Sequence, residues 1–225
     1  MLQAVAGKIS QRKEHLFALA CCQRIWHLLP DERCQLALTG LETFADKNCS
    51  WEEFLDLALG VVDANAEYSN GILEQETCLS DVATGPLPEP PRTVACYATQ
   101  AVRWAMDTYG PKGFSTALCA VYTIDIATGS RAAVEGEEAA QRSLLRCIAG
   151  PEPNRSVVID DSWLSSNVVL VASAIYQERA FDRLSILADA LEDAGCNNVD
   201  ILNHCRQPGE HVRGCWVVDL LLAKE

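Results

Sequence analysis

The clearest pattern in the chain lies in residues 167–225, which read NVVLVASAIYQERAFDRLSILADALEDAGCNNVDILNHCRQPGEHVRGCWVVDLLLAKE. Between residues 181 and 191, apolar side chains recur every three or four positions, which places them on one face of a helix. Gly195 follows the last of them, where a left-handed helix end favours glycine. The two asparagines after it are good N-cap residues for a short helix to about Cys205. This stretch therefore predicts consecutive helices separated by tight turns.

The chain is expected to close with one more helix. Gln207-Pro208-Gly209 interrupts the helical pattern, because proline and glycine fit turns better than helix interiors. A final helix is then expected from about Glu210 to Leu222. Its residues are apolar on most sides, so this helix should lie deep in the core.

Composition extends the helical prediction to the whole chain. The 225 residues are 49% hydrophobic but only 7% aromatic, and β-branched residues occur in short groups without long alternation. We therefore expect an all-α fold, a multi-helix bundle or orthogonal helical array of roughly 8–11 helices with little or no β structure.

Start and stop residues indicate further helices along the chain. Ser10 can cap a helix to about Leu29, which ends before Pro30, and a second helix is expected from about residue 31 to 46. Ser50 and Glu53 have the spacing of a capping box, which would open a third helix. Later helices are expected at about residues 93–108 and 130–148.

Residues 115–126 allow two interpretations. They are apolar almost throughout, and the group VYTI at 121–124 is compatible with a strand. We favour a helix because the neighbouring patterns are helical and a lone strand has no partner.

A proline-rich stretch provides a candidate domain boundary. Residues 80–92 read SDVATGPLPEPPR, with four prolines and one glycine, and no regular element is expected there. The sequence therefore predicts a helical subdomain at 1–79, a linker or loop at 80–92 and a second helical subdomain at 93–225. One continuous domain is the alternative.

Charge and cysteine content restrict the class of protein. The net charge of −13 and the pI of about 4.7 disfavour binding to nucleic acid and to anionic membranes. No apolar run approaches the length of a membrane span. The 11 cysteines form an odd set without the spacing of a disulfide framework, which favours the reducing cytoplasm. The sequence does not predict an oligomeric state.

Histidine and cysteine gather near the C-terminus. The candidate metal ligands are His204, Cys205, His211 and Cys215, with Cys196 as a substitute for one of them. His211 and Cys215 would share one face of the expected final helix, because they are four residues apart. Thiolate and imidazole are ligands that Zn²⁺ prefers, and four suffice for a closed structural site. The alternative is that Cys215 packs in the core while the histidines form hydrogen bonds near the turn.

Two neighbouring cysteines raise a second chemical hypothesis. Cys21 and Cys22 could act as thiol nucleophiles if His15 or His27 lay beside them as a base. The sequence offsets of six and five residues do not bring these side chains onto one helix face. We therefore expect both cysteines to be core residues.

Four charged residues accompany the apolar helices of the closing stretch. Arg183, Arg206, Arg213 and Asp219 are expected to form ion pairs that fix how helices dock, since the arginine fork suits a carboxylate. A surface that faces a partner is the alternative.

Three stretches carry motifs: LFA and CCQRIWHLL in residues 16–29, DSWL in residues 161–164, and AFDRL, DAGC, HCR and HVRGCWVVDLL in residues 180–221. With these motifs the chain resembles an uncharacterised paralogous family of planctomycete bacteria. The resemblance covers roughly two fifths of the chain and leaves residues 50–150 unmatched. It implies a helical bacterial protein and transfers no catalytic residue, since the family has no established activity.

These observations favour a non-catalytic helical module that binds or scaffolds another protein. An acidic helical surface without recognisable catalytic motifs is the basis for this expectation. One alternative is a zinc-stabilised helical regulatory domain that uses Cys205, His211 and Cys215. The other is an enzyme whose site carries no familiar motif.

Overall fold

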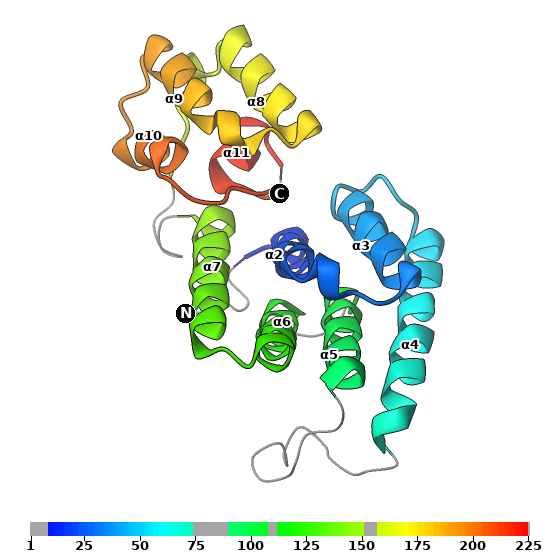
Figure 1. The fold of residues 1–225 in the computed structure, drawn as a ribbon. Coiled ribbons are helices and arrows are strands. Elements are labelled where there is room, and N and C mark those ends of the chain that lie inside the picture. The colour runs from blue at the N-terminus through cyan, green and yellow to red at the C-terminus, as the bar shows by residue number, and fades with distance from the viewer. Residues whose placement is uncertain (1–8, 74–89, 108–111, 151–156, 225) are drawn as a thin grey trace. The chain divides into compact units, whose positions relative to one another are not determined.

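The protein is helical wherever the structure describes it. The computed structural model describes residues 9–73, 90–107, 112–150 and 157–224 (Figure 1). Within these ranges the chain forms ten α-helices and three short 3-10 helices and no strand. The predicted all-α class is confirmed. None of the helices described has the length and apolar content that crossing a bilayer requires.

The chain divides into two compact units, each of which is described by itself. Unit 1 comprises Met1–Lys13 and Arg142–Glu225, and unit 2 comprises Glu14–Gln141. The division predicted at residues 80–92 remains a prediction, because residues 80–89 lie outside the described part. Pro90 is already helical. A proline fits the first turn, where its missing N–H would have had no partner, so the helix begins inside the proline-rich stretch.

Unit 2 is built from helices that precede residue 142. They are α2 (Gln11–Arg24) from Glu14 onward, η1 (Trp26–Leu28), α3 (Glu32–Ala45), α4 (Trp51–Leu73), α5 (Pro90–Ala105), α6 (Lys112–Thr128) and the first part of α7 (Arg131–Ala149). Their buried core includes Leu16, Leu38, Leu41, Phe54 and Val102. Residues 115–126 are helical, which confirms the favoured interpretation. In a unit that contains only helices among its described residues, a strand there would have lacked a pairing partner.

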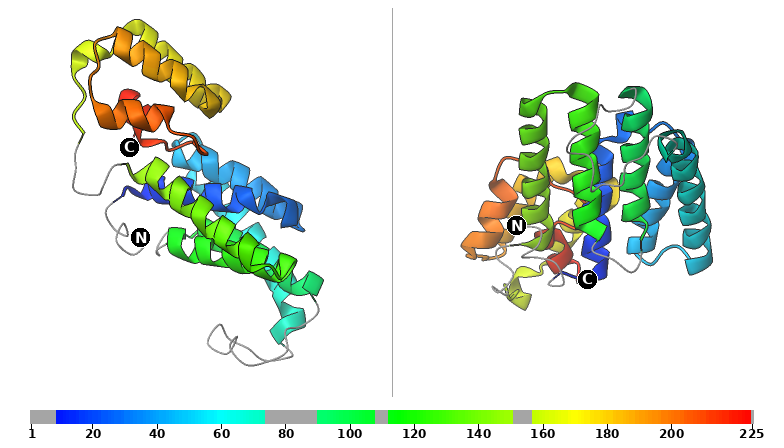
Figure 2. Two further views of the ribbon diagram at one scale, coloured as in Figure 1. Left: turned by 60° about the vertical axis from the view of Figure 1, so that its left-hand side comes forward. Right: turned by 90° about the horizontal axis from the view of Figure 1, so that it is seen from below.

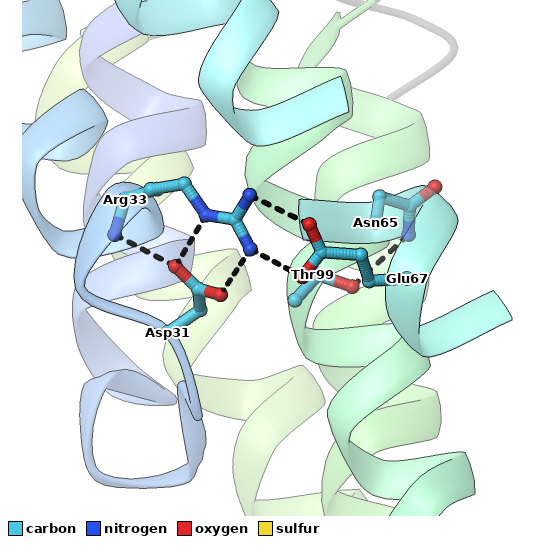
Figure 3. A network of polar contacts seen from close by, with 5 residues as sticks. All are labelled: Asp31, Arg33, Asn65, Glu67 and Thr99. Atoms are coloured by element: carbon cyan, nitrogen blue, oxygen red, sulfur yellow. Dashed lines mark hydrogen bonds and ion pairs between the residues drawn. The ribbon is translucent and has the colours of Figure 1, made fainter. Parts of the chain in front are cut away.

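Polar contacts fix the entry and the packing of α3 and α4. Ser50 and Glu53 form the predicted capping box: the Ser50 N–H donates to Glu53 Oε2 at 2.8 Å, and the Glu53 N–H donates to Ser50 Oγ at 3.2 Å. Arg33 on α3 donates to the carboxylates of Asp31 and of Glu67 on α4 (Figure 3). A 3.0 Å hydrogen bond from Asn65 to Thr99 then joins α4 to α5.

Unit 1 contains the stretch with the clearest helical pattern. After the end of α7 come η2 (Asp161–Trp163), α8 (Ser166–Glu178), η3 (Phe181–Arg183), α9 (Leu184–Asp193), α10 (Val199–Arg206) and α11 (Trp216–Leu221). Helices α8 and α9 lie side by side (Figure 2). The apolar face of α9 is buried as predicted. Gly195 ends α9 in the left-handed conformation, with φ of 85°, and the N–H of Cys196 reaches back to Leu191 O at 2.9 Å.

The closing helix is shorter than predicted. Helix α11 begins at Trp216, whereas the sequence suggested a start near Glu210. Gly209 and Gly214 have φ of 147° and 92°, which are not helical values, so the intervening segment is a loop. The prediction that the last helix lies in the core is confirmed, since Val217 and Val218 are fully buried.

Candidate metal centre

Four side chains from four places in unit 1 come together. Cys147 lies in the last turns of α7, His204 in the last turn of α10, His211 in the loop that follows, and Cys215 at the N-cap of α11. We call these four residues the Cys/His cluster. Its members are separated by up to 68 positions in the chain, so tertiary packing alone brings Cys147 to the others.

The loop between α10 and α11 turns the chain back toward α10. Pro208 restricts the residue before it to an extended backbone, and Gln207 has the expected φ of −65° and ψ of 140°. Gly214 adopts a left-handed conformation directly before Cys215, which other residues rarely adopt. The loop thereby brings His211 and Cys215 back beside His204.

The donor atoms are as close as metal ligands need to be. One ligand atom from each residue lies within 4.8 Å of the other three. His204 Nε2 is 3.2 Å from Cys215 Sγ, and Cys147 Sγ is 3.5 Å from His211 Nδ1. A tetrahedral zinc ion with ordinary Zn–S and Zn–N lengths keeps its ligand atoms about 3.3–3.8 Å apart. The cluster therefore needs only a small contraction to surround an ion.

Burial keeps solvent away from most of the cluster. Cys215 is 0% exposed and Cys147 is 1% exposed, and His204 is also buried, while His211 is half-buried. The His204 ring packs edge-on against His211 and lies 5.3 Å from the Trp216 ring. Three of the four donor residues are therefore buried away from solvent.

The electrostatics favour a thiolate at the centre of the cluster. Burial raises the pKa of the Cys215 thiol, but hydrogen bonds with Cys147, His204 and His211 outweigh burial and lower that pKa well below its usual value. The same hydrogen bond to Cys215, together with burial, raises the pKa of Cys147. Burial lowers the pKa of His211, whereas its hydrogen bond to Cys215 gives a net rise. Protons on the neighbours thus stabilise negative charge on Cys215, as a metal cation would.

Gln207 contacts both histidines through their outer nitrogens. His211 Nε2 lies 3.4 Å from the Gln207 carbonyl oxygen, which leaves Nδ1 facing the cluster. His204 Nδ1 lies 3.1 Å from the side-chain amide of Gln207, which leaves Nε2 facing Cys215. Such contacts orient histidine rings around metals. If Nε2 of His204 held a metal, Nδ1 of the same ring would carry the proton and would need a hydrogen-bond acceptor. A flip of the Gln207 side-chain amide would place its oxygen there as the acceptor.

The structure brings together three of the four ligands predicted from the sequence. Cys205 is buried in the apolar core of unit 1 and is not part of the cluster, and Cys196 is buried in the same core. Burial raises the pKa of both thiols, which suits a core role. Cys147 replaces Cys205 in the set. The prediction that His211 and Cys215 share a helix face was wrong, because His211 lies in a loop.

The charged residues of the closing stretch form contacts within unit 1. Asp219 on α11 accepts from Arg12 Nη1 at 2.7 Å in a buried ion pair. Arg206 on α10 pairs with Asp189 and Glu192 on α9. Two further contacts complete the set: Arg213 donates to the Tyr176 carbonyl at 3.0 Å, and Arg183 pairs with Glu178 at 3.1 Å.

The cysteine pair on α2 is surrounded by core residues. Cys21 and Cys22 are fully buried, and burial raises the pKa of Cys22 well above its usual value. The His15 ring packs against Phe44, with ring centroids 5.8 Å apart, and His27 is exposed. This environment agrees with the expectation of core cysteines and gives the thiol-nucleophile hypothesis no support.

No family model matches the chain, and neither a curated protein nor a solved structure matches it. The resemblance to the planctomycete family stays a prediction that depends on the motifs of residues 16–29, 161–164 and 180–221. The function of the chain is therefore inferred from its own geometry alone.

Proposed function

We propose that unit 1 is a zinc-stabilised helical domain in which the Cys/His cluster holds one structural Zn²⁺. The single observation that carries this proposal is the convergence of four donor atoms from α7, α10, the following loop and α11. Two thiols and two imidazoles are a donor set that suits zinc. Carboxylate oxygens, which Mg²⁺ and Ca²⁺ prefer, do not belong to the set.

A structural role fits better than a catalytic one. Four protein ligands complete a tetrahedral zinc site, whereas catalytic zinc keeps one position for water or substrate. Cys215 has no exposed surface, so a substrate would not reach it in this arrangement. The low pKa of Cys215 is therefore interpreted as preparation for binding a cation and not as activation of a nucleophile.

The metal would hold the closing segment onto α7. The loop at residues 207–215 is held by few regular backbone hydrogen bonds, because it contains Pro208 and two glycines with non-helical φ. A metal bonded to Cys147 and Cys215 would fix both ends of a long stretch of chain. Zinc binding would then contribute directly to the folding free energy of unit 1.

Binding to another protein remains the wider role that we propose for the chain. A metal centre without an open position supports a module whose task is to present a stable helical surface. The cytoplasmic location expected from the free thiols is part of the same proposal, since all ten cysteines in the described part of the chain are free.

A cobalt titration tests the zinc proposal. Co²⁺ is added to metal-free protein under reducing conditions, and thiolate-to-cobalt and tetrahedral d–d bands are recorded before and after Zn²⁺ is added. We expect one Co²⁺ per chain with tetrahedral bands, displaced by one Zn²⁺. Cys147→Ser should lose this binding. Cys205→Ser is the matched control, because Cys205 is a similarly buried thiol of the same core that lies outside the cluster.

Two outcomes would reject the zinc proposal. One is the absence of tetrahedral bands in folded wild-type protein. The other is equal loss of binding in Cys147→Ser and Cys205→Ser, which would mean that the ligands were assigned wrongly or that binding follows general stability.

A further inference from the structure

Helix α4 of unit 2 has an apolar face that the core does not use. Four apolar residues recur at steps of four, four and three, which is the spacing of a single helix face: Trp51, Leu55, Leu59 and Val62. Their exposed fractions are 48%, 42%, 53% and 43%. We call these four residues the α4 seam.

The core of unit 2 uses a different face of the same helix. Phe54, Val61 and Ala64 are buried, and they precede or follow the seam residues by one or two positions. Single exposed apolar residues are ordinary, but a row of four along three turns of one helix is a contiguous apolar strip. Contiguous exposed apolar surface is typical of sites that bind another molecule.

A row of carboxylates runs along the seam. Three of these carboxylates directly follow a residue of the α4 seam, and the fourth follows Ala66, which extends the seam by one turn. They are Glu52, Asp56, Asp63 and Glu67. One residue along a helix is a rotation of about 100°, so the acidic row lies beside the seam over its whole length. Helix α4 contains no basic residue. We call these four carboxylates the acidic row.

Arg33 shows how a cation fits this row. The position that would continue the row between Asp56 and Asp63 is Gly60, and the Arg33 side chain packs there, 3.9 Å from an ideal Cβ on the glycine. Its guanidinium makes two hydrogen bonds to Glu67, at 2.9 and 2.7 Å (Figure 3). A basic side chain that lies along α4 can therefore reach a row carboxylate in the bidentate geometry that arginine favours.

We propose that the α4 seam is the docking surface for an amphipathic helix of another protein, one with Lys or Arg along one flank of its apolar face. The apolar face would cover the seam, and the basic flank would pair with Glu52, Asp56 and Asp63, the members of the acidic row that precede the Arg33–Glu67 pair. A second copy of this chain is a poor occupant, because its net charge is −13 and it would bring another acidic row. Trp51 would be the anchor, since its ring is already held by Phe44 and Phe54 at 6.0 and 5.8 Å.

A pair of designed peptides tests the proposal on the full chain. Both are amphipathic helices of about five turns with the same leucine face, and they differ only in carrying Lys or Glu along one flank. Affinity is measured by fluorescence anisotropy at low and high salt. We expect the Lys peptide to bind at least about tenfold more tightly than the Glu peptide, with the difference shrinking as salt rises.

Variants separate the apolar and the charged contributions. The double variant Leu55→Ser, Leu59→Ser should weaken the Lys peptide by about tenfold or more, since both substitutions remove exposed side chains of the seam. Leu118→Ser on α6 is the control, because Leu118 is 38% exposed and outside the seam, and it should bind as the wild type does. Asp56→Lys with Asp63→Lys should reverse the preference between the two peptides.

The outcomes that overturn the proposal are distinct from those that reject the zinc centre. Equal affinity for the two peptides, or equal binding by the Leu55→Ser, Leu59→Ser variant and the Leu118→Ser control, removes the docking surface. Self-association in sedimentation velocity that this seam variant abolishes would assign the seam to a second copy and would also overturn the proposal. Circular dichroism of each variant verifies that unit 2 remains folded.

Discussion

Removing zinc should destabilise unit 1 of the wild-type protein far more than unit 1 of a variant that lacks one of the proposed zinc ligands. A ligand that binds only the folded state adds RT ln(1 + [L]/Kd) to the unfolding free energy, which is about 4 kcal/mol when free zinc exceeds its Kd by 1,000-fold. In a domain of about 100 residues, each kcal/mol shifts Tm by roughly 4–8 °C. Unit 1 is of this size, so chelation should lower its Tm by roughly 15–30 °C.

The assay compares two forms of each variant by differential scanning calorimetry. Wild type, Cys147→Ser and Cys205→Ser are each measured with zinc and after removal of zinc by a chelator under reducing conditions. The difference between the two forms of one variant cancels the packing loss that the substitution itself causes. Intrinsic fluorescence provides a second reading, to which Trp216 contributes among the five tryptophans, since its ring lies 5.3 Å from that of His204.

In the wild type and in Cys205→Ser, we expect a large difference in unfolding free energy between the zinc-bound and zinc-free forms. In Cys147→Ser, this difference should be below about 1 kcal/mol. The reasoning would be refuted if chelation left the wild-type melting curve unchanged. It would equally be refuted if Cys147→Ser kept the full difference, because Cys147 is the ligand that links α7 to the rest of the cluster.

Three further predictions test the surroundings of the cluster and the packing of each unit. Gln207→Ala should weaken zinc binding by about 10–100-fold, measured by competition with a chromophoric chelator, because it removes the partner of a histidine nitrogen. Asp219→Asn should cost about 3–5 kcal/mol in urea unfolding, since it removes the carboxylate charge from the buried ion pair with Arg12. Asp31→Ala should cost about 1 kcal/mol near neutral pH through loss of the α3 cap. The hydrogen bond with Arg33 lowers the pKa of Asp31 in the folded state below its unfolded value of 3.8. The stabilisation by Asp31 is therefore fully present above pH 3.8 and is lost as the pH falls through the lower folded pKa. Urea titrations at neutral and acidic pH measure the change.

Local chemistry made much of the helical fold predictable. The Ser50–Glu53 capping box and the glycine after α9 act through contacts within a few residues, and both signals can be read from short stretches of sequence. The same locality explains the errors. The apolar run that closes the chain predicted a helix from about Glu210, whereas the conformations of Gly209 and Gly214 delay the start of regular structure to Trp216.

The members of the Cys/His cluster could not all be predicted from the sequence, because tertiary packing brings them together. Cys147 is 57 or more positions from its companions, and nothing in its local pattern distinguishes it from other buried cysteines. Cys205 follows His204 in the sequence and has the same donor chemistry as Cys147, but neighbouring helical residues point in different directions, and only His204 of the two belongs to the cluster. The α4 seam was missed for a related reason: apolar residues on two faces of one helix look like a single buried helix until a structure shows which face is covered.

The most direct test of the zinc proposal is the metal content of the full chain purified without an affinity tag under reducing conditions. Inductively coupled plasma mass spectrometry, normalised to protein by amino-acid analysis, should find close to one zinc per folded chain. Less than about a tenth of an equivalent, in protein that is folded by circular dichroism and was never exposed to chelator, would contradict the proposed zinc centre.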